Sequence, residues 1–292
     1  MSDSAHTVET ILIESDFGEL YKYKPKTRMA TRKDFEKAII KRCKNPKINT
    51  NGYFLNNSEN LLDGIDIDLY QDDLMRGSGN ELKSKFNAVF SSSALAVNNF
   101  SIVKKHLPKF TCFDYSNFDE AQFERQFKTG LSGTPPNLDF SIENKDVIIA
   151  FESKYLETTR KKEAKFADSY NKYKLDYLDD MWFDLIKKYK HSKLYLDVAQ
   201  LIKHSIGLIN HRRQNTKQKA IFVYLYWTPD NFNEFPNFTQ HQKELAEFKK
   251  DINKSKDLKF ISLTYNDFWN LYDDTNFKKH FDEMRNRYKI KI

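Results

Sequence analysis

An α/β fold with a mixed central β-sheet flanked by helices is predicted from the 292-residue sequence. Apolar runs of strand length stand at 147–151 ("VIIAF") and 221–227 ("IFVYLYW"). Between them, the segment 194–214 has the apolar spacing of a helix. The predicted order of helix, two strands, helix and strand is typical of a sheet covered by helices on its faces.

Composition limits the class of protein. Hydrophobic residues make up 39% of the chain, with 24 Phe and 16 Tyr, which is enough for one large domain or a core with an appendage. No apolar run approaches the roughly 20 residues of a membrane span, and the N-terminus lacks the pattern of a secretory signal. Cys43 and Cys112 form neither a zinc motif nor a disulfide framework. We therefore expect a reduced, cytoplasmic protein without a membrane partner.

The net charge has two explanations. A charge of +7 and an isoelectric point near 9.0 suit a polyanionic partner such as a nucleic acid. However, a chain rich in Lys, Asn, Phe, Tyr and Ile acquires this charge from composition alone. Charge by itself leaves both explanations open.

The first 80 residues are predicted to form an N-terminal extension, and residues 81–292 the main domain. A helix is expected at 32–44, followed by a turn-rich stretch at 45–60. Five aspartates then crowd together without the glycine and terminal glutamate of a calcium loop, which favours a solvated edge or a helix start. They are Asp63, Asp66, Asp68, Asp72 and Asp73. Helices are also expected among the C-terminal residues.

The main domain is predicted to begin with helices at 80–100 and 118–127. In the second of these, Asp119 is a plausible N-cap, and Phe123 and Phe127 share one apolar face. "GLSGTPPN" ends this helix. A strand at 138–142, a turn at 143–146 and a strand at 147–154 follow. Further along, we expect a charged helix at 159–190, a helix at 194–214, a strand at 219–227, and a strand and helix within 258–272.

Polar residues end the most apolar strand. Glu152 and Lys154 share one face because side chains alternate along a strand. A hairpin turning at 143–146 would bring Asp139 beside Glu152. Two carboxylates and a backbone carbonyl suit Mg²⁺, and a neighbouring lysine would stabilise charge on a phosphate. The alternative is a solvated ion pair at a strand end.

The stretch "PPNLDFSIENKDVIIAFESK" resembles the Asp…Glu-x-Lys signature of the PD-(D/E)XK nuclease superfamily, which has the restriction-endonuclease-like fold. The resemblance covers about residues 118–228 and is greatest to a bacterial restriction-endonuclease-like group. It implies a metal-dependent DNA endonuclease acting in restriction or defence, with Mg²⁺ as cofactor and Mn²⁺ as a substitute. One strand of the family fold, before the aspartate strand, is expected to be short or displaced.

The resemblance also implies roles for individual residues. Asp139 and Glu152 would be metal ligands together with the carbonyl oxygen of Ser153, and Lys154 would be the catalytic lysine. Glu124, expected on the helix 118–127, would bind the metal directly or through water; a surface acid is the alternative. Gln200, on the helix that follows the strands, would complete the catalytic set.

The helix 194–214 carries a polar stripe. Gln200, His204 and His211 recur at helical spacing with Gly207, and the first two could bind a water or a phosphate oxygen. His211, Arg212 and Arg213 could contact a nucleic-acid backbone, although capping of the helix end also explains the arginines, and a structural role also explains His204.

Two rival functions stay open from the sequence. One is a nucleic-acid-binding protein that kept the fold without catalysis, and the other is a nuclease acting on RNA or branched DNA. The absence of a phosphate-binding glycine loop and of a zinc motif excludes several other enzyme classes and predicts no small-molecule cofactor. A homodimer is the expected assembly if both strands of a duplex are cut.

Overall fold

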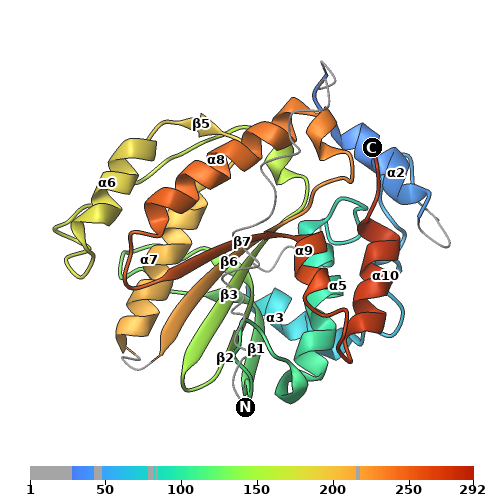
Figure 1. Ribbon diagram of the computed structural model, residues 1–292, viewed down its shortest axis with the longest axis horizontal. Helices are drawn as coiled ribbons and strands as arrows, with labels where there is room; N and C mark the ends of the chain where they lie inside the picture. Colours follow the sequence, from blue (N-terminus) through green and yellow to red (C-terminus); the bar gives the residue numbers. More distant parts are fainter. Residues whose placement is uncertain (1–27, 43–47, 78–81, 83–84, 215–217) are drawn as a thin grey trace, which may run out of the picture.

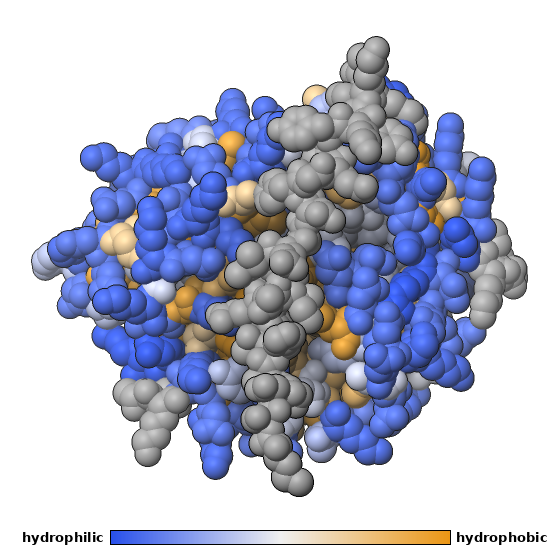
Figure 2. Space-filling view, viewed as in Figure 1, coloured by the Kyte–Doolittle hydropathy of each residue, from blue (hydrophilic) through white to orange (hydrophobic). Residues whose placement is uncertain are grey.

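The computed structural model describes residues 28–42, 48–77, 82, 85–214 and 218–292. Its centre is a five-stranded sheet between two layers of helices (Figure 1). Hydrophilic residues dominate the face of the molecule shown in Figure 2, as expected for a chain in which 30% of residues are charged. In the described part of the chain, no helix is long and apolar enough to cross a membrane.

The central sheet has the strand order β1-β2-β3-β6-β7. Its first three strands are antiparallel and its last three are parallel. Its strands are β1 (Glu120–Gln126), β2 (Asn137–Glu143), β3 (Val147–Lys154), β6 (Lys219–Tyr226) and β7 (Lys259–Thr264). A separate pair consists of β4 (Lys162–Glu163) and β5 (Lys193–Leu194). The fold class predicted from the sequence, with its mixed central sheet, is confirmed.

Helices cover both faces of this sheet (Figure 1). One layer contains α6 (Asp180–Tyr189), α7 (Val198–Gln214) and α8 (Pro236–Ile252). The other contains α5 (Ser92–Lys105), α9 (Tyr265–Asn270) and α10 (Lys278–Tyr288). Nearer the N-terminus lie α2 (Arg32–Ile40) and α3 (Gln71–Arg76).

Each face of the sheet has its own hydrophobic cluster. Along β3, Ile148 and Ala150 belong to the cluster under α7, whereas Ile149 and Phe151 belong to the cluster under α5. A strand buried on both faces is apolar without alternation, which accounts for the run "VIIAF". Phe35, from the segment predicted to be an extension, belongs to the same cluster as Phe151.

The predicted helix at 118–127 is wrong, because this segment forms strand β1. Phe123 and Phe127 have the spacing of one helical face, but they lie in different clusters on opposite sides of the sheet. The reversal occurs at Glu124, whose backbone is left-handed with φ +50°. β1 is also the strand that was expected before the aspartate strand; it is not short, since it has seven residues, and it occupies the segment that was predicted to be a helix.

The predicted helix at 159–190 is correct only over α6. Before it, the chain runs in turns and in the two residues of β4, with Phe166 and Leu175 buried in the cluster under α7. Burial of these two side chains outweighs the helix propensity of the neighbouring lysines, so the segment does not form a helix. The helix expected at 80–100 is α5, which begins and ends later. Residues 78–81 and 83–84 lie outside the described residues.

Gly207 of α7 is a packing residue. A Cβ atom at this position would lie 2.5 Å from the carbonyl oxygen of Phe127 and 3.0 Å from its Cβ. We predict that Gly207→Ala lowers the free energy of unfolding by about 2 kcal/mol, measured by urea denaturation, because overpacking costs about 1–3 kcal/mol. A gain of about 1 kcal/mol, the usual effect of Gly→Ala inside a helix, would contradict this packing.

His241 of α8 is fully buried, and its Nε2 lies 2.9 Å from the hydroxyl of Tyr224. Burial lowers its pKa to about 3. As the pH falls, this histidine therefore takes up a proton in the unfolded chain before it does so in the folded protein. The contribution of neutral His241 to the free energy of unfolding is complete above pH ~6.5 and is lost as the pH falls toward 3. We predict that between pH 6.5 and 4 the stability of His241→Gln falls less steeply than that of the wild type, by up to about 1.4 kcal/mol per pH unit. His106→Gln, at an exposed position, should keep the wild-type slope; a shared slope for all three proteins would refute the assignment.

Candidate active site

The predicted site lies where β2 and β3 separate. Their pairing ends at Phe140 and Phe151, one position before Asp139 and Glu152 would face each other. In place of a further ladder bond, Asp139 Oδ2 accepts a hydrogen bond from the backbone N–H of Ser153 at 2.6 Å. The sheet therefore opens beside the two carboxylates.

Glu152 is enclosed between two basic side chains. Its exposed fraction is 1%. Lys154 Nζ donates a hydrogen bond to its Oε1, and Nε2 of His204 lies 3.1 Å from its Oε2. Burial raises the pKa of Glu152, but the attraction of Lys154 and His204 outweighs it and lowers this pKa to about 2. Glu152 is therefore ionised at neutral pH.

Lys154 is held in its charged form. Lys154 is 7% exposed, and its burial lowers its pKa. The carboxylates of Glu152, Glu157 and Asp139 raise this pKa by more than burial lowers it, so the net pKa is above the ordinary value. A protonated ammonium cannot accept a proton. Lys154 can therefore stabilise negative charge in this site, but it cannot serve as a base.

Asp139 has the opposite balance. Burial raises its pKa well above the ordinary value, and the charges of Glu152 and Glu124 raise it further. Lys154 and the N–H of Ser153 lower it by less. The site thus contains more carboxylate groups than its lysine can neutralise, which is the condition that a bound cation relieves.

Glu124 reaches the site from β1. Phe123 pairs with Phe140 and Arg125 with Leu138, so Glu124 occupies the position opposite Asp139. Asn137 Nδ2 donates a hydrogen bond to Glu124 Oε2 at 2.9 Å. The structure therefore brings Glu124 to the expected place, but from a strand and not from the predicted helix.

The residues predicted on α7 divide into two groups. Gln200 is partly buried in the first turn, where its N–H is bound by Asp197 Oδ1 at 3.1 Å. One turn later, His204 contacts Glu152 and is 1% exposed. These two positions lie at the end of α7 near the site.

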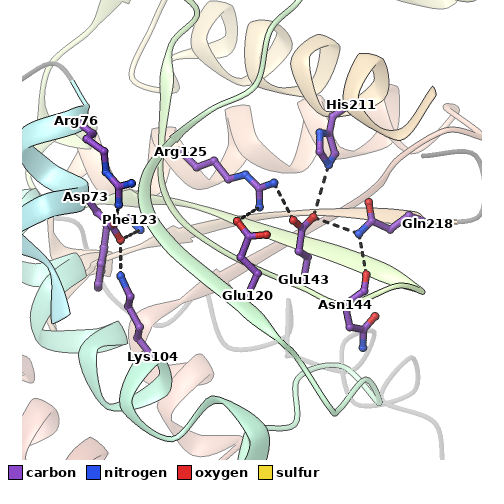
Figure 3. A network of polar contacts seen from close by, with 10 residues as sticks. All are labelled: Asp73, Arg76, Lys104, Glu120, Phe123, Arg125, Glu143, Asn144, His211 and Gln218. Carbon is purple, nitrogen blue, oxygen red and sulfur yellow. Dashed lines mark hydrogen bonds and ion pairs between the residues drawn. The ribbon is translucent and has the colours of Figure 1, made fainter. Parts of the chain in front are cut away.

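The other three predicted residues of α7 lie at its far end and contact other parts of the protein. His211 Nε2 lies 3.6 Å from Glu143 Oε2 (Figure 3). Glu143 is four positions along the strand from Asp139, or about 13 Å. Arg212 Nη1 lies 2.7 Å from Asp257 Oδ1. Arg213 lies 4.5 Å from the ring centre of Tyr177.

Sequence reasoning missed two residues near the site. Asp73, expected among solvated acids, is 4% exposed and accepts the N–H of Phe123 at 2.9 Å. The hydroxyl of Tyr265 lies 2.6 Å from Ser153 Oγ, on the face of β3 opposite Glu152. Both contacts join residues at least 50 positions apart, so no local pattern could reveal them.

Oxygen donors for a hard cation are present at the opening of the sheet. Asp139 and Glu152 supply carboxylates, and the buried Oε2 of Glu152 faces Nε2 of His204 at 3.1 Å. In the same part of the chain, no group of three His, Cys, Asp or Glu side chains is arranged to hold a metal ion. A cation here would thus need the Ser153 carbonyl and water as further ligands, which is the coordination that Mg²⁺ prefers.

Removal of the buried lysine should destabilise the fold. Lys154→Met leaves the carboxylate of Glu152 buried with one basic partner fewer, and we predict a loss of about 3 kcal/mol in urea denaturation at pH 7. Lys162→Met is the matched control, because it breaks a half-exposed ion pair in which Lys162 Nζ lies 2.9 Å from Asp197 Oδ2. This substitution should lower the free energy of unfolding by less than about 1 kcal/mol. Equal losses in the two variants would contradict the buried pair.

Comparison with known proteins gives one finding on the family. The model of the family described as restriction endonuclease associating with ARP matches residues 28–289, which is most of the chain. No curated protein and no solved structure matches. The match extends from before α2 to the end of α10, so it includes every strand of the central sheet. The chain belongs to this restriction-endonuclease family.

Proposed function

We propose that this protein is a Mg²⁺-dependent endonuclease of the PD-(D/E)XK type that hydrolyses DNA in restriction or another defence against foreign DNA. Membership of a restriction-endonuclease family supports a nuclease role. The observation that carries the proposal is the convergence of Asp139, Glu152 and Lys154 where β2 and β3 separate. The proposal includes a cytoplasmic location, in which the enzyme would meet foreign DNA.

The proposed metal ligands are Asp139, Glu152 and the carbonyl oxygen of Ser153. The N–H of Ser153 points toward Asp139, and the N–H and C=O of one strand residue point to the same side. Its carbonyl is therefore directed at the opening of the sheet. When bound there, Mg²⁺, or Mn²⁺ in its place, would neutralise phosphate charge and acidify a water molecule.

Lys154 would act as a fixed positive charge. Its raised pKa keeps the ammonium protonated, so it would donate hydrogen bonds to the oxygens of the scissile phosphate and stabilise the charge that develops there. His204 is too buried to reach a DNA strand. Its proposed role is to orient Glu152, which it contacts at 3.1 Å.

Glu124 and Gln200 would complete the site. Glu124 adds a third carboxylate opposite Asp139. It would bind the metal through water, since it does not form a metal-holding group with Asp139 and Glu152 in this arrangement. Gln200, one turn before His204, would hydrogen-bond a water or a phosphate oxygen. At the far end of α7, Arg212 would contact the DNA backbone only by exchanging Asp257 for a phosphate; His211 and Arg213 would likewise exchange their partners.

Duplex DNA is the proposed substrate, and the net charge of +7 suits it. The proposed active unit is a homodimer, because two copies of one site can cut the two strands of a duplex. No small-molecule cofactor is part of the proposal.

Supercoiled plasmid tests the proposal. We predict that the wild type nicks or cuts it with Mg²⁺ or Mn²⁺, and that Asp139→Asn slows cleavage by about 10³-fold, the magnitude typical of losing one group that stabilises developing charge. Asp146→Asn is the matched control, because Asp146 is exposed at the turn of the same hairpin; it should cleave at the wild-type rate.

Other outcomes would select the rival functions. Tight binding of DNA without cleavage across divalent metals would identify a binding protein that lacks catalysis. Cleavage of RNA or branched DNA, with duplex DNA left intact, would move the activity to another substrate. Equal loss in Asp139→Asn and Asp146→Asn would place the chemistry outside this site.

A further inference from the structure

Glu124 has an unusual backbone for a residue inside a strand. Its φ of +50° lies in the left-handed region, which residues other than glycine rarely occupy and which costs about 1 kcal/mol or more. The turn reverses the alternation of β1, so that Phe123 and Phe127 lie on opposite faces of the sheet. Without this turn, the carboxylate of Glu124 would be directed to another place.

The residue before Glu124 is fixed by Asp73. β1 is an edge strand, and on its open edge the N–H of Phe123 donates to Asp73 Oδ2 at 2.9 Å (Figure 3). Lys104 Nζ lies 2.5 Å from the same oxygen, and Arg76 donates to Oδ1 at 2.6 Å. Asp73 is thereby a buried carboxylate held by two cations, and it replaces the acceptor that a further strand would supply.

The residue after Glu124 is fixed by a second group of charges. Arg125 Nη2 donates to Glu143 Oε1 at 2.8 Å, and its Nη1 lies 3.6 Å from Glu120 Oε1 (Figure 3). Gln218 contacts the other oxygen of Glu143 at 3.2 Å. The two neighbours of Glu124 are therefore held from opposite directions, which determines the backbone between them.

α3 also shapes the space beside Glu124. Gly77 directly follows this helix, and a Cβ atom there would lie 2.8 Å from Glu124 Cβ and 3.0 Å from Nδ2 of Asn137. The end of α3 thus packs against the left-handed turn itself. Asn137, in turn, donates to the carboxylate of Glu124.

We propose that Asp73 is a positioning residue of the active site, which holds β1 in the turn that directs Glu124 toward Asp139. This inference rests on the proposed nuclease function. It gives the segment before residue 80 a part in catalysis, through α3. A purely structural ion pair would stabilise the fold equally well, but its loss would not act through Glu124.

The first test concerns geometry and needs no activity. In Asp73→Ala, the amide of Phe123 should lose its protection from hydrogen exchange, and a crystal structure should show Glu124 outside the left-handed region. Asp73→Asn keeps an acceptor oxygen for Phe123 and should retain both features. Asp66→Ala is the matched control. Asp66 forms an exposed ion pair of 2.9 Å with Lys105, which directly follows Lys104, the partner of Asp73.

The second test concerns catalysis. Asp73→Ala should lower kcat by about 100-fold, the cost expected for a misplaced catalytic group, with KM for plasmid within about twofold. Asp73→Ala combined with Glu124→Gln should be no slower than Glu124→Gln alone, because both changes remove one function. Asp66→Ala should match the wild type.

Each contrary outcome has its own meaning. An unchanged Glu124 backbone in folded Asp73→Ala would overturn the inference whether or not the protein is a nuclease. Losses that multiply in the double variant would overturn it as well, because Asp73 would then act elsewhere. A wild-type protein that cleaves nothing would overturn the nuclease function on which the inference rests, and the exchange and crystallographic results would still decide whether Asp73 holds the turn.

Discussion

The hydrogen bond from the N–H of Ser153 to the carboxylate of Asp139 is the contact on which the site depends. It replaces a rung of the β2–β3 ladder with a side chain, so the two strands separate without leaving the N–H of Ser153 unpaired. The opening receives Glu152 and Lys154 on one face, while Tyr265 holds the side chain of Ser153 on the other. Sheet topology, by placing β3 between an antiparallel and a parallel neighbour, fixes all of these positions at one end of one strand.

Electrostatics then assigns a state to each group. Glu152 is ionised because Lys154 and His204 outweigh its burial, whereas Asp139 is driven toward its neutral form by burial and by the neighbouring carboxylates. A bound divalent cation would lower the pKa of Asp139 again and would leave Glu152 ionised. Oxygen donors with excess negative charge, beside a lysine that stays protonated, suit the metal-assisted cleavage of a phosphodiester that we propose.

The sequence predicted the parts of the site that depend on local pattern. Alternation along β3 placed Glu152 and Lys154 on one face, and the short turn at 143–146 brought Asp139 to them. The same reasoning failed for Glu124, because the spacing of Phe123 and Phe127 suggests a helix unless the left-handed residue between them is known. Burial of Asp73 was also beyond local pattern, since two of its three partners, Lys104 and Phe123, come from distant segments and the sequence there is a run of acids that usually faces water.

The proposed function depends on a divalent cation held jointly by Asp139, Glu152 and the Ser153 carbonyl. Anomalous diffraction from a crystal soaked in Mn²⁺ measures this directly, because the scattering of manganese locates the ion without reference to activity. We expect one strong peak in the opening between β2 and β3, with the ligand oxygens of these three residues at about 2.1 Å from it. A crystal that binds Mn²⁺ elsewhere while this opening stays empty, with Glu152 still paired to Lys154, would contradict this proposal.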